Sequence, residues 1–209
     1  MIFQRQDLIL FQGDSITDCG RNRLAPNDMG FGYAIMAAAW LSAMRPEHEL
    51  RFLNRGIGGD RVCDLKRRWT TDCIELKPDW VSIMVGINEV WRRFDSNDPT
   101  ATEVYERDYR EILGQVREAL PETRFILIEP FVLETSPDRA AWREDLDSKI
   151  AVVRRLANEF SAILIPLDGI FAGAAAKRKP AFWAEDGVHP SPAGHALIAQ
   201  SWLNAVEAN

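Results

Sequence analysis

Short apolar runs recur along the chain, and longer stretches between them mix apolar and charged residues. Five runs have the length and composition of strands that are covered on both faces of a sheet: 8–12, 50–53, 80–85, 125–128 and 162–167. The third run is apolar except for Ser82. We therefore expect five short strands.

The stretches between these runs have the length and periodicity of helices. The predicted helices are 31–44, 62–76, 102–120, 142–160 and 192–206. Strands that alternate with helices favour a parallel sheet with helices on both faces, joined by right-handed crossovers. The predicted fold class is α/β, with three layers, five parallel strands in the order 2-1-3-4-5, and a single domain over residues 1–209.

Polar residues of chemical interest lie just beyond the predicted strands. Ser15 follows the first strand, Gly59 the second and Asn88 the third, while His189 lies in a loop beyond the fifth. In a sheet of order 2-1-3, the loops after the first three strands are neighbours at the carboxyl edge, where such sheets bind ligands. These side chains are therefore expected to converge.

A candidate nucleophile, its base and a carboxylate that orients the base are present in Ser15, His189 and Asp186. A serine hydroxyl is a weak nucleophile unless a base accepts its proton, and a neutral histidine oriented by a carboxylate does this near pH 7. Asp186 and His189 are three residues apart across an Asp-Gly turn, and Pro190 restricts the backbone at His189. Taken alone, Ser15 is more often a turn or helix-capping residue.

Acyl transfer also requires hydrogen-bond donors for the oxyanion of the tetrahedral intermediate. The backbone amides of Ser15 and Gly59 and the side-chain amide of Asn88 are the candidates for this oxyanion hole. The glycines of residues 56–59 do not complete a nucleotide-binding pattern, and no cluster of ligand residues indicates a metal. We expect neither a metal nor another cofactor.

Four segments carry a resemblance to a known family. GDSIT, NRGIGGD, GINE and DGVHP resemble, in order, the four sequence blocks of the SGNH (GDSL-type) hydrolase superfamily. GDSITDCGR, DLKRRW, KPDWVSIMVGINEVWR and HPSPAGH are most similar to its intracellular acetylxylan esterases, which are carbohydrate acetylesterases with a flavodoxin-like sheet. The resemblance implies that Ser15 is the nucleophile, that Asp186 and His189 complete the triad, and that Gly59 and Asn88 are oxyanion donors.

The chain departs from the family blocks at two positions. Glu89 stands where the third block usually has aspartate, and Gly58 stands where the second block often has serine. Neither change removes a catalytic group. Both affect the hydrogen bonds that support the site.

Aromatic and charged residues near these blocks are candidates for substrate binding. The chain has seven tryptophans, and Trp91 and Trp183 each lie within three residues of a proposed catalytic residue. Sugar rings stack well on indoles. Arg92 and Asp14 are the other two candidate contacts. The alternatives are core packing for the tryptophans, a solvated helix face for Arg92, and a turn or capping role for Asp14.

Composition and charge indicate which partners and which cellular compartment to expect for this protein. A net charge of −6 argues against nucleic-acid and anionic-membrane surfaces as partners. Three cysteines without a CxxC pair fit reduced thiols, and the amino terminus lacks an apolar region of signal-peptide length, so we expect a cytoplasmic protein. A homo-oligomer is also expected, chiefly from the family resemblance.

The predicted function is that of a serine esterase that removes acetyl groups from acetylated carbohydrates, in particular xylo-oligosaccharides. The alternatives are a lysophospholipase, thioesterase or aryl-esterase of the same superfamily, or a carbohydrate-binding module that has lost turnover. Acetyl and longer acyl esters distinguish the enzymes from one another. A covalent serine probe distinguishes all of them from a binding module.

Overall fold

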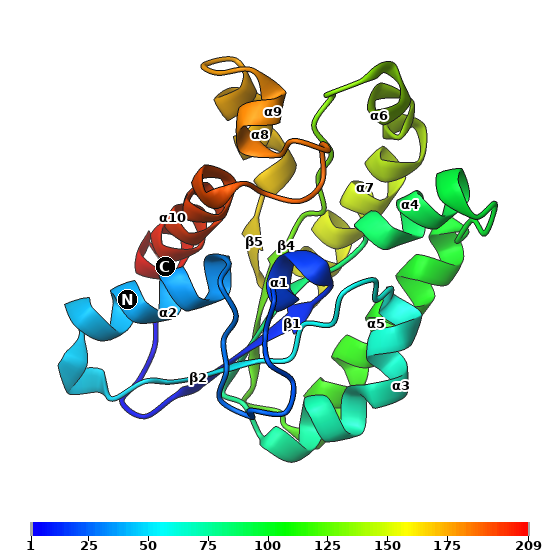
Figure 1. Ribbon diagram of the computed structural model, residues 1–209. Helices are drawn as coiled ribbons and strands as arrows, with labels where there is room; N and C mark the ends of the chain where they lie inside the picture. The colour runs from blue at the N-terminus through cyan, green and yellow to red at the C-terminus, as the bar shows by residue number, and fades with distance from the viewer. Residues whose placement is uncertain (1, 209) are drawn as a thin grey trace.

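A five-stranded sheet forms the centre of the computed structural model, which describes residues 2–208 (Figure 1). The strands are β1 (Leu8–Gly13), β2 (Arg51–Asn54), β3 (Trp80–Met84), β4 (Arg124–Ile128) and β5 (Ile163–Ile165). All neighbouring pairs are parallel and the order is β2-β1-β3-β4-β5. The predicted fold class and strand order are confirmed.

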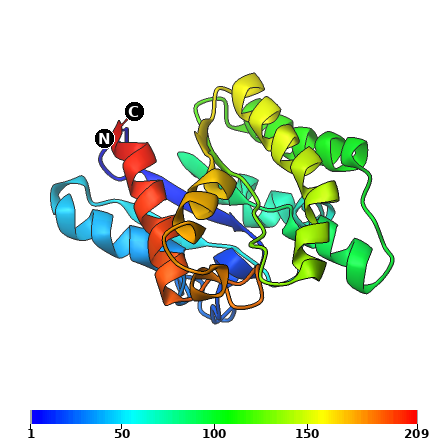
Figure 2. The ribbon, with the colours of Figure 1, turned by 90° about the horizontal axis from the view of Figure 1, so that it is seen from above.

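Helices cover both faces of this sheet (Figure 2). On one face lie α2 (Tyr33–Met44), α8 (Leu167–Ala175) and α10 (Pro192–Ala208); on the other lie α3 (Val62–Asp72), α5 (Thr102–Ala119) and α7 (Arg143–Glu159). Each face of the sheet has its own hydrophobic core: the first core lies on the side of α2 and α10, and the second on the side of α3 and α5. Because successive strand residues point to opposite faces, Ile9 and Phe11 pack in the first core and Leu10 in the second.

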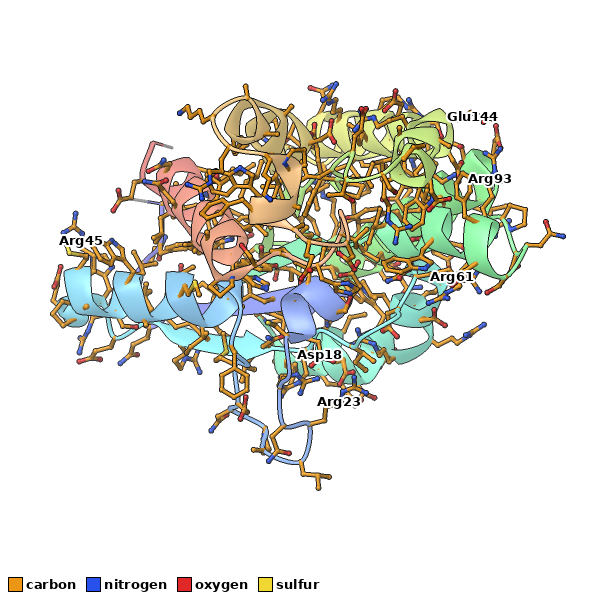
Figure 3. The ribbon with its side chains drawn as sticks, turned by 45° about the horizontal axis from the view of Figure 1, so that its top comes forward. Asp18, Arg23, Arg45, Arg61, Arg93 and Glu144 are labelled. Atoms are coloured by element: carbon orange, nitrogen blue, oxygen red, sulfur yellow. The ribbon has the colours of Figure 1, made fainter. Side chains whose placement is uncertain are left out.

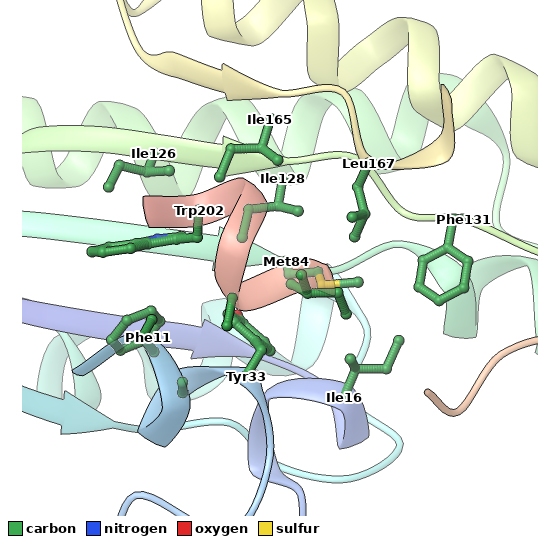
Figure 4. Close-up of a cluster of buried hydrophobic side chains, with 14 of the residues drawn as sticks. Phe11, Ile16, Tyr33, Met84, Ile126, Ile128, Phe131, Ile165, Leu167 and Trp202 are labelled. Carbon is green, nitrogen blue, oxygen red and sulfur yellow. The ribbon is translucent and has the colours of Figure 1, made fainter. Parts of the chain in front are cut away.

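The first core is rich in aromatic rings (Figure 4). The ring of Phe11 lies 5.8 Å from that of Tyr33 and 5.4 Å from that of Trp202, measured between centroids. The indole N–H of Trp202 donates to Oγ of Ser82 over 3.0 Å, and both residues are fully buried. This bond explains why the third strand tolerates one polar residue, since a buried hydroxyl needs a partner.

Several short helices were not expected from the sequence. They are α1 (Ser15–Asp18), α4 (Ile87–Asp95), α6 (Pro137–Ala141), α8 (Leu167–Ala175), α9 (Pro180–Trp183) and the 3₁₀ turn Pro46–His48. The fifth predicted strand is also shorter than expected, because residue 167 begins α8. The predicted helix 62–76 is interrupted: α3 ends at Asp72, and a 3₁₀ turn, Ile74–Leu76, follows. The additional helices matter for function, because α1 and α4 start at the carboxyl ends of β1 and β3.

Candidate active site

Ser15 lies at the start of α1, directly after the end of β1. The bend before it depends on Gly13, which has φ +154°; a Cβ atom there would lie 2.2 Å from the carbonyl oxygen of Met84 on β3. Oδ1 of Asp14 then accepts the N–H of Ile16 over 3.0 Å and caps the helix. This local structure presents the half-buried Ser15 at the carboxyl edge of the sheet.

Three side chains from the two ends of the chain form a hydrogen-bonded row. Oγ of Ser15 lies 3.0 Å from Nε2 of His189, and Nδ1 of His189 lies 2.7 Å from Oδ2 of Asp186. The other oxygen of Asp186 accepts the backbone N–H groups of Val188, over 2.9 Å, and of His189, over 2.7 Å. The carboxylate therefore fixes both the backbone and the ring of His189.

The ionisation of this pair suits a general base. The hydrogen bond to Asp186 raises the pKa of His189 above its ordinary value of 6.5, against the opposing effect of partial burial. Burial alone raises the pKa of Asp186, but the hydrogen bonds from the ring and the two backbone amides outweigh it, so this pKa lies well below its usual range. Asp186 therefore stays ionised and holds the Nδ1 proton, which leaves Nε2 of neutral His189 free to accept the proton of Ser15.

The three candidate oxyanion donors lie at the carboxyl edge of the sheet: Ser15 begins α1, Gly59 lies in the loop after β2, and Asn88 lies in the first turn of α4. Within residues 2–208, the backbone N–H groups of Ser15 and Gly59 donate to no protein acceptor. Gly59 is exposed and has φ +87°, a conformation that favours glycine. The side-chain amide of Asn88 donates one hydrogen to the carbonyl oxygen of Asp60 over 3.0 Å, which orients the group and leaves its second hydrogen available.

Comparison with known proteins places the chain in a family. Residues 11–197 match the GDSL-like lipase/acylhydrolase family. The chain belongs to this family. It is a carboxylic ester hydrolase, as this membership and its relatives indicate.

Named relatives of this GDSL-like protein share most of its length. It is 39% identical over 204 residues to an acetylxylan esterase from Geobacillus stearothermophilus, covering 95% of this chain and 93% of the relative. Crystal structures of mutants of Axe2, an acetylxylan esterase from that organism, superpose with a TM-score of 0.91 at 35% identity, covering 99% of this chain and 96% of theirs. LAE5, an alpha/beta hydrolase from the metagenome of Lake Arreo in Spain, gives a TM-score of 0.90 at 33% identity, covering 99% of this chain and 98% of LAE5.

The matching Axe2 structures include three catalytic mutants, in which a serine, an aspartate and a histidine are each replaced by alanine. These are the residue types that the row of Ser15, Asp186 and His189 combines.

Glu89, the first departure from the GDSL-type blocks, has a defined partner. Its side chain is 1% exposed, and Oε1 accepts the backbone N–H of Val62 over 2.7 Å. Val62 is the first residue of α3, so Glu89 caps that helix from α4. Burial raises the pKa of Glu89 to about 7. The longer side chain thus connects the helix that carries Asn88 to the helix that follows Gly59.

Gly58, the second departure, is exposed and bonded through its backbone. Its N–H donates to Oδ2 of Asp18 over 2.9 Å. The same carboxylate accepts Nη2 of Arg23 over 2.6 Å (Figure 3). Asp18, in the last turn of α1, therefore joins the helix of Ser15 to the loop that contains Gly59.

Asp14, expected as a substrate contact, lies below the surface. Its side chain is 1% exposed and caps α1. Burial raises the pKa of Asp14 to about 7, and its second carboxylate oxygen has no protein partner within residues 2–208. The burial of Asp14 and its bond to Ile16 agree with the alternative of a capping residue, since the aspartate is turned into the protein.

The other candidate substrate residues occupy different surroundings. The ring of Trp91 lies 5.6 Å from that of His189, between centroids, and Trp91 is partly exposed. The indole N–H of Trp183 donates to the carbonyl oxygens of Ala174, over 3.1 Å, and of Arg178, over 3.3 Å, so it is occupied within the protein. Arg92 pairs with Asp95 on the same helix. Only Trp91 lies directly against a proposed catalytic side chain.

One further residue beside the site, Arg139, was not identified from the sequence, whereas the contacts of His195 are structural. Nε of Arg139 donates to the carbonyl oxygen of Asp186 over 2.7 Å, and the sequence shows no pattern that links these positions. His195 accepts the N–H of Tyr33 at Nδ1 over 3.2 Å, and its Nε2 lies 3.4 Å from Sγ of Cys19. Burial lowers the pKa of His195 to about 4, so it is a neutral packing residue.

Proposed function

We propose that this esterase removes acetyl groups from acetylated carbohydrates, and from acetylated xylo-oligosaccharides in particular. The observation that carries the proposal is the row of Ser15, His189 and Asp186, with distances of 3.0 and 2.7 Å, in a chain 39% identical to an acetylxylan esterase. His189 is exposed, so the site is open to the bulky alcohol of a sugar ester.

The proposed reaction proceeds through an acetyl-enzyme. Oγ of Ser15 attacks the acetyl carbonyl carbon while Nε2 of His189 takes the hydroxyl proton. The oxyanion accepts hydrogen bonds from the N–H groups of Ser15 and Gly59 and from the amide of Asn88. When the carbon–oxygen bond to the sugar breaks, His189 returns its proton to the sugar oxygen, and the free alcohol leaves.

Water completes the cycle. His189 takes a proton from the water as its oxygen attacks the acetyl-Ser15 carbonyl carbon. Collapse of the second tetrahedral intermediate breaks the bond to Oγ, returns the proton from His189 to Oγ of Ser15, and releases acetic acid, which ionises to acetate in solution. Asp186 stays ionised throughout and stabilises the protonated ring of His189.

Sugar recognition is proposed to involve the partly exposed Trp91, beside His189, with Trp183 and Arg92 farther along the surface. An indole face stacks on the apolar face of a pyranose ring, and a guanidinium donates to its hydroxyls. Of these residues, Trp91 has the strongest support, because it lies against the base.

We further infer a cytoplasmic homo-oligomer consisting of single-domain subunits. Cys19, Cys63 and Cys73 are free thiols, as is usual in a reducing compartment. No helix among residues 2–208 has both the length and the apolar character needed to cross a bilayer.

Exposed aromatic side chains support the proposed homo-oligomer. Phe31 and Trp40, with 76% and 59% of their surface accessible, are the kind of side chains that subunit contacts cover. Sedimentation of the purified protein measures its assembly state.

The substrate class is tested by acetate release. Acetylated xylo-oligosaccharides are compared with other acetylated sugars, and nitrophenyl acetate with nitrophenyl octanoate. We expect the highest kcat/KM on acetylated xylo-oligosaccharides and a preference for acetate over octanoate. Faster cleavage of octanoate, without acetate release from any sugar, would instead indicate the lysophospholipase or thioesterase class.

A further inference from the structure

Arg139 contacts the catalytic turn from a segment outside the four family blocks. It lies on α6, and its Nε donates to the carbonyl oxygen of Asp186 over 2.7 Å. Its guanidinium carbon lies 4.0 Å from the ring centroid of Trp142 and 4.8 Å from that of Trp91. The side chain is only 16% exposed. One cation therefore holds a backbone oxygen of the turn while it stacks on two indole rings.

The catalytic turn, residues 186–189, packs closely against the segment that carries Arg139. The backbone N–H of Leu133 donates to the carbonyl oxygen of Gly187 over 2.8 Å. A Cβ atom on Gly187, which has φ +84°, would lie 2.5 Å from the carbonyl oxygen of Leu133 and 3.2 Å from Cγ of Arg139. Gly187 therefore packs so closely against this segment that a side chain at this position would not fit.

Trp91 lies between Arg139 and the ring of His189 and contacts both. The Trp91 ring packs 5.2 Å from that of Trp142 and 5.6 Å from that of His189, between centroids. By contrast, the pairing of Arg139 with Asp138, at 3.2 Å, involves a carboxylate whose side chain is 66% exposed. The buried contacts of Arg139 therefore restrain the catalytic turn, whereas the exposed ion pair contributes little.

We propose that Arg139 is a positioning residue: it fixes the carbonyl of Asp186 and the ring of Trp91 so that Nε2 of His189 remains directed at Oγ of Ser15. This inference rests on the proposed esterase mechanism and adds a residue to it. Arg139 does not touch the reacting atoms. It acts by keeping the base within hydrogen-bond distance of the nucleophile.

The positive charge of Arg139 lowers the pKa of His189, so its loss can be detected in the pH profile of the reaction, which a purely structural residue would not change. The groups that influence His189 are Asp186 and Asp14, which raise its pKa, and Arg139, which lowers it. His195, the other histidine that interacts with it, stays neutral because burial lowers its own pKa to about 4. Loss of the Arg139 charge should therefore raise the pKa of His189 and shift the pH profile of the reaction upward.

The test compares Arg139→Gln, which removes the charge and the stacked guanidinium, with Arg139→Lys, which keeps the charge alone. Arg93→Gln is the matched control, because Arg93 stacks on Phe94 at 5.4 Å and pairs with Glu144 at 3.0 Å. Hydrolysis of nitrophenyl acetate gives kcat, KM and the pH dependence of kcat/KM, and thermal melting reports folding. The wild-type rate separates this test from that of the proposed function, which fails if the wild type has no activity.

We expect Arg139→Gln to lower kcat about 10- to 100-fold, with KM changed by less than about twofold and the pH midpoint moved upward. Arg139→Lys should lower kcat but leave the midpoint near that of the wild type, and Arg93→Gln should change neither. An active wild type with kcat unchanged in both Arg139 variants would overturn the proposal. A lower melting temperature in Arg139→Gln with an unmoved pH midpoint would also overturn it, because Arg139 would then only support the fold.

Discussion

Nε2 of His189 lies 3.0 Å from Oγ of Ser15, although 174 residues separate them along the chain. The parallel sheet brings them together, because β1 delivers Ser15 to its carboxyl edge and the loop before α10 returns His189 to the same edge. This distance lies within the range that direct proton transfer from the hydroxyl to the imidazole requires.

Replacement of either partner should nearly abolish hydrolysis. We expect Ser15→Ala and His189→Ala each to lower kcat by at least about 10⁴-fold, because the nucleophile and its base act as a unit. Steady-state hydrolysis of nitrophenyl acetate measures this loss. His48→Ala is the matched control for His189, since His48 lies in the 3₁₀ turn after α2, and it should keep the wild-type rate. Near-normal turnover in either triad variant would mean that the nucleophile or the base is misassigned.

Asn88→Ala tests the oxyanion donor. Loss of one such donor costs about 10²- to 10³-fold in kcat, because the hydrogen bond strengthens as negative charge develops in the transition state. Asn158→Ala, an exposed change on α7, serves as the control. A kcat for Asn88→Ala equal to that of the control would exclude Asn88 from the oxyanion hole.

The rate should depend on pH through His189. The base works only when neutral, and the hydrogen bond to Asp186 raises its pKa above 6.5. Thus kcat/KM should rise with pH and reach its half-maximum above pH 6.5. Initial rates across the pH range, measured well below KM, give this midpoint. A flat profile, or a midpoint below 6, would argue against His189 as the base.

Buried Glu89 should make stability depend on pH. Its pKa is raised to about 7 from an ordinary value of 4.5, so its contribution to stability is complete below pH 4.5 and is lost as the pH rises through 7. Glutamine cannot ionise and keeps an acceptor for the N–H of Val62. The melting temperature of Glu89→Gln relative to the wild type should therefore be more favourable at pH 8 than at pH 4.5. The exposed change Glu118→Gln should show no such trend, and a pH-independent difference for Glu89→Gln would contradict the raised pKa.

The sequence was most informative where local pattern and sheet geometry agree. Apolar runs predicted the strands, and their alternation with helices predicted a doubly wound sheet, for which the order 2-1-3-4-5 is usual. Parallel strands in this order explain why Ser15, Gly59 and Asn88 lie at one edge. The orientation of individual side chains could not be predicted in this way. Asp14, next to Ser15, turns inward because its carboxylate caps α1.

Contacts between segments far apart in the sequence also escaped prediction. Glu89 reaches across 27 residues to Val62, and Arg139 reaches across 47 residues to Asp186. These bonds depend on how α4 and α6 pack, and neither helix has a sequence pattern long enough to predict its position. Such contacts support the proposed site without belonging to any sequence block.

Covalent labelling tests the central claim, that Ser15 is the activated nucleophile, most directly. The intact protein is treated with a fluorophosphonate, and the modified peptide is located by mass spectrometry, with Ser15→Ala treated in parallel. The account predicts one adduct, on Ser15, that is absent from the variant and forms more slowly in His189→Ala. An unlabelled wild type, or equal labelling of Ser15→Ala, would contradict it.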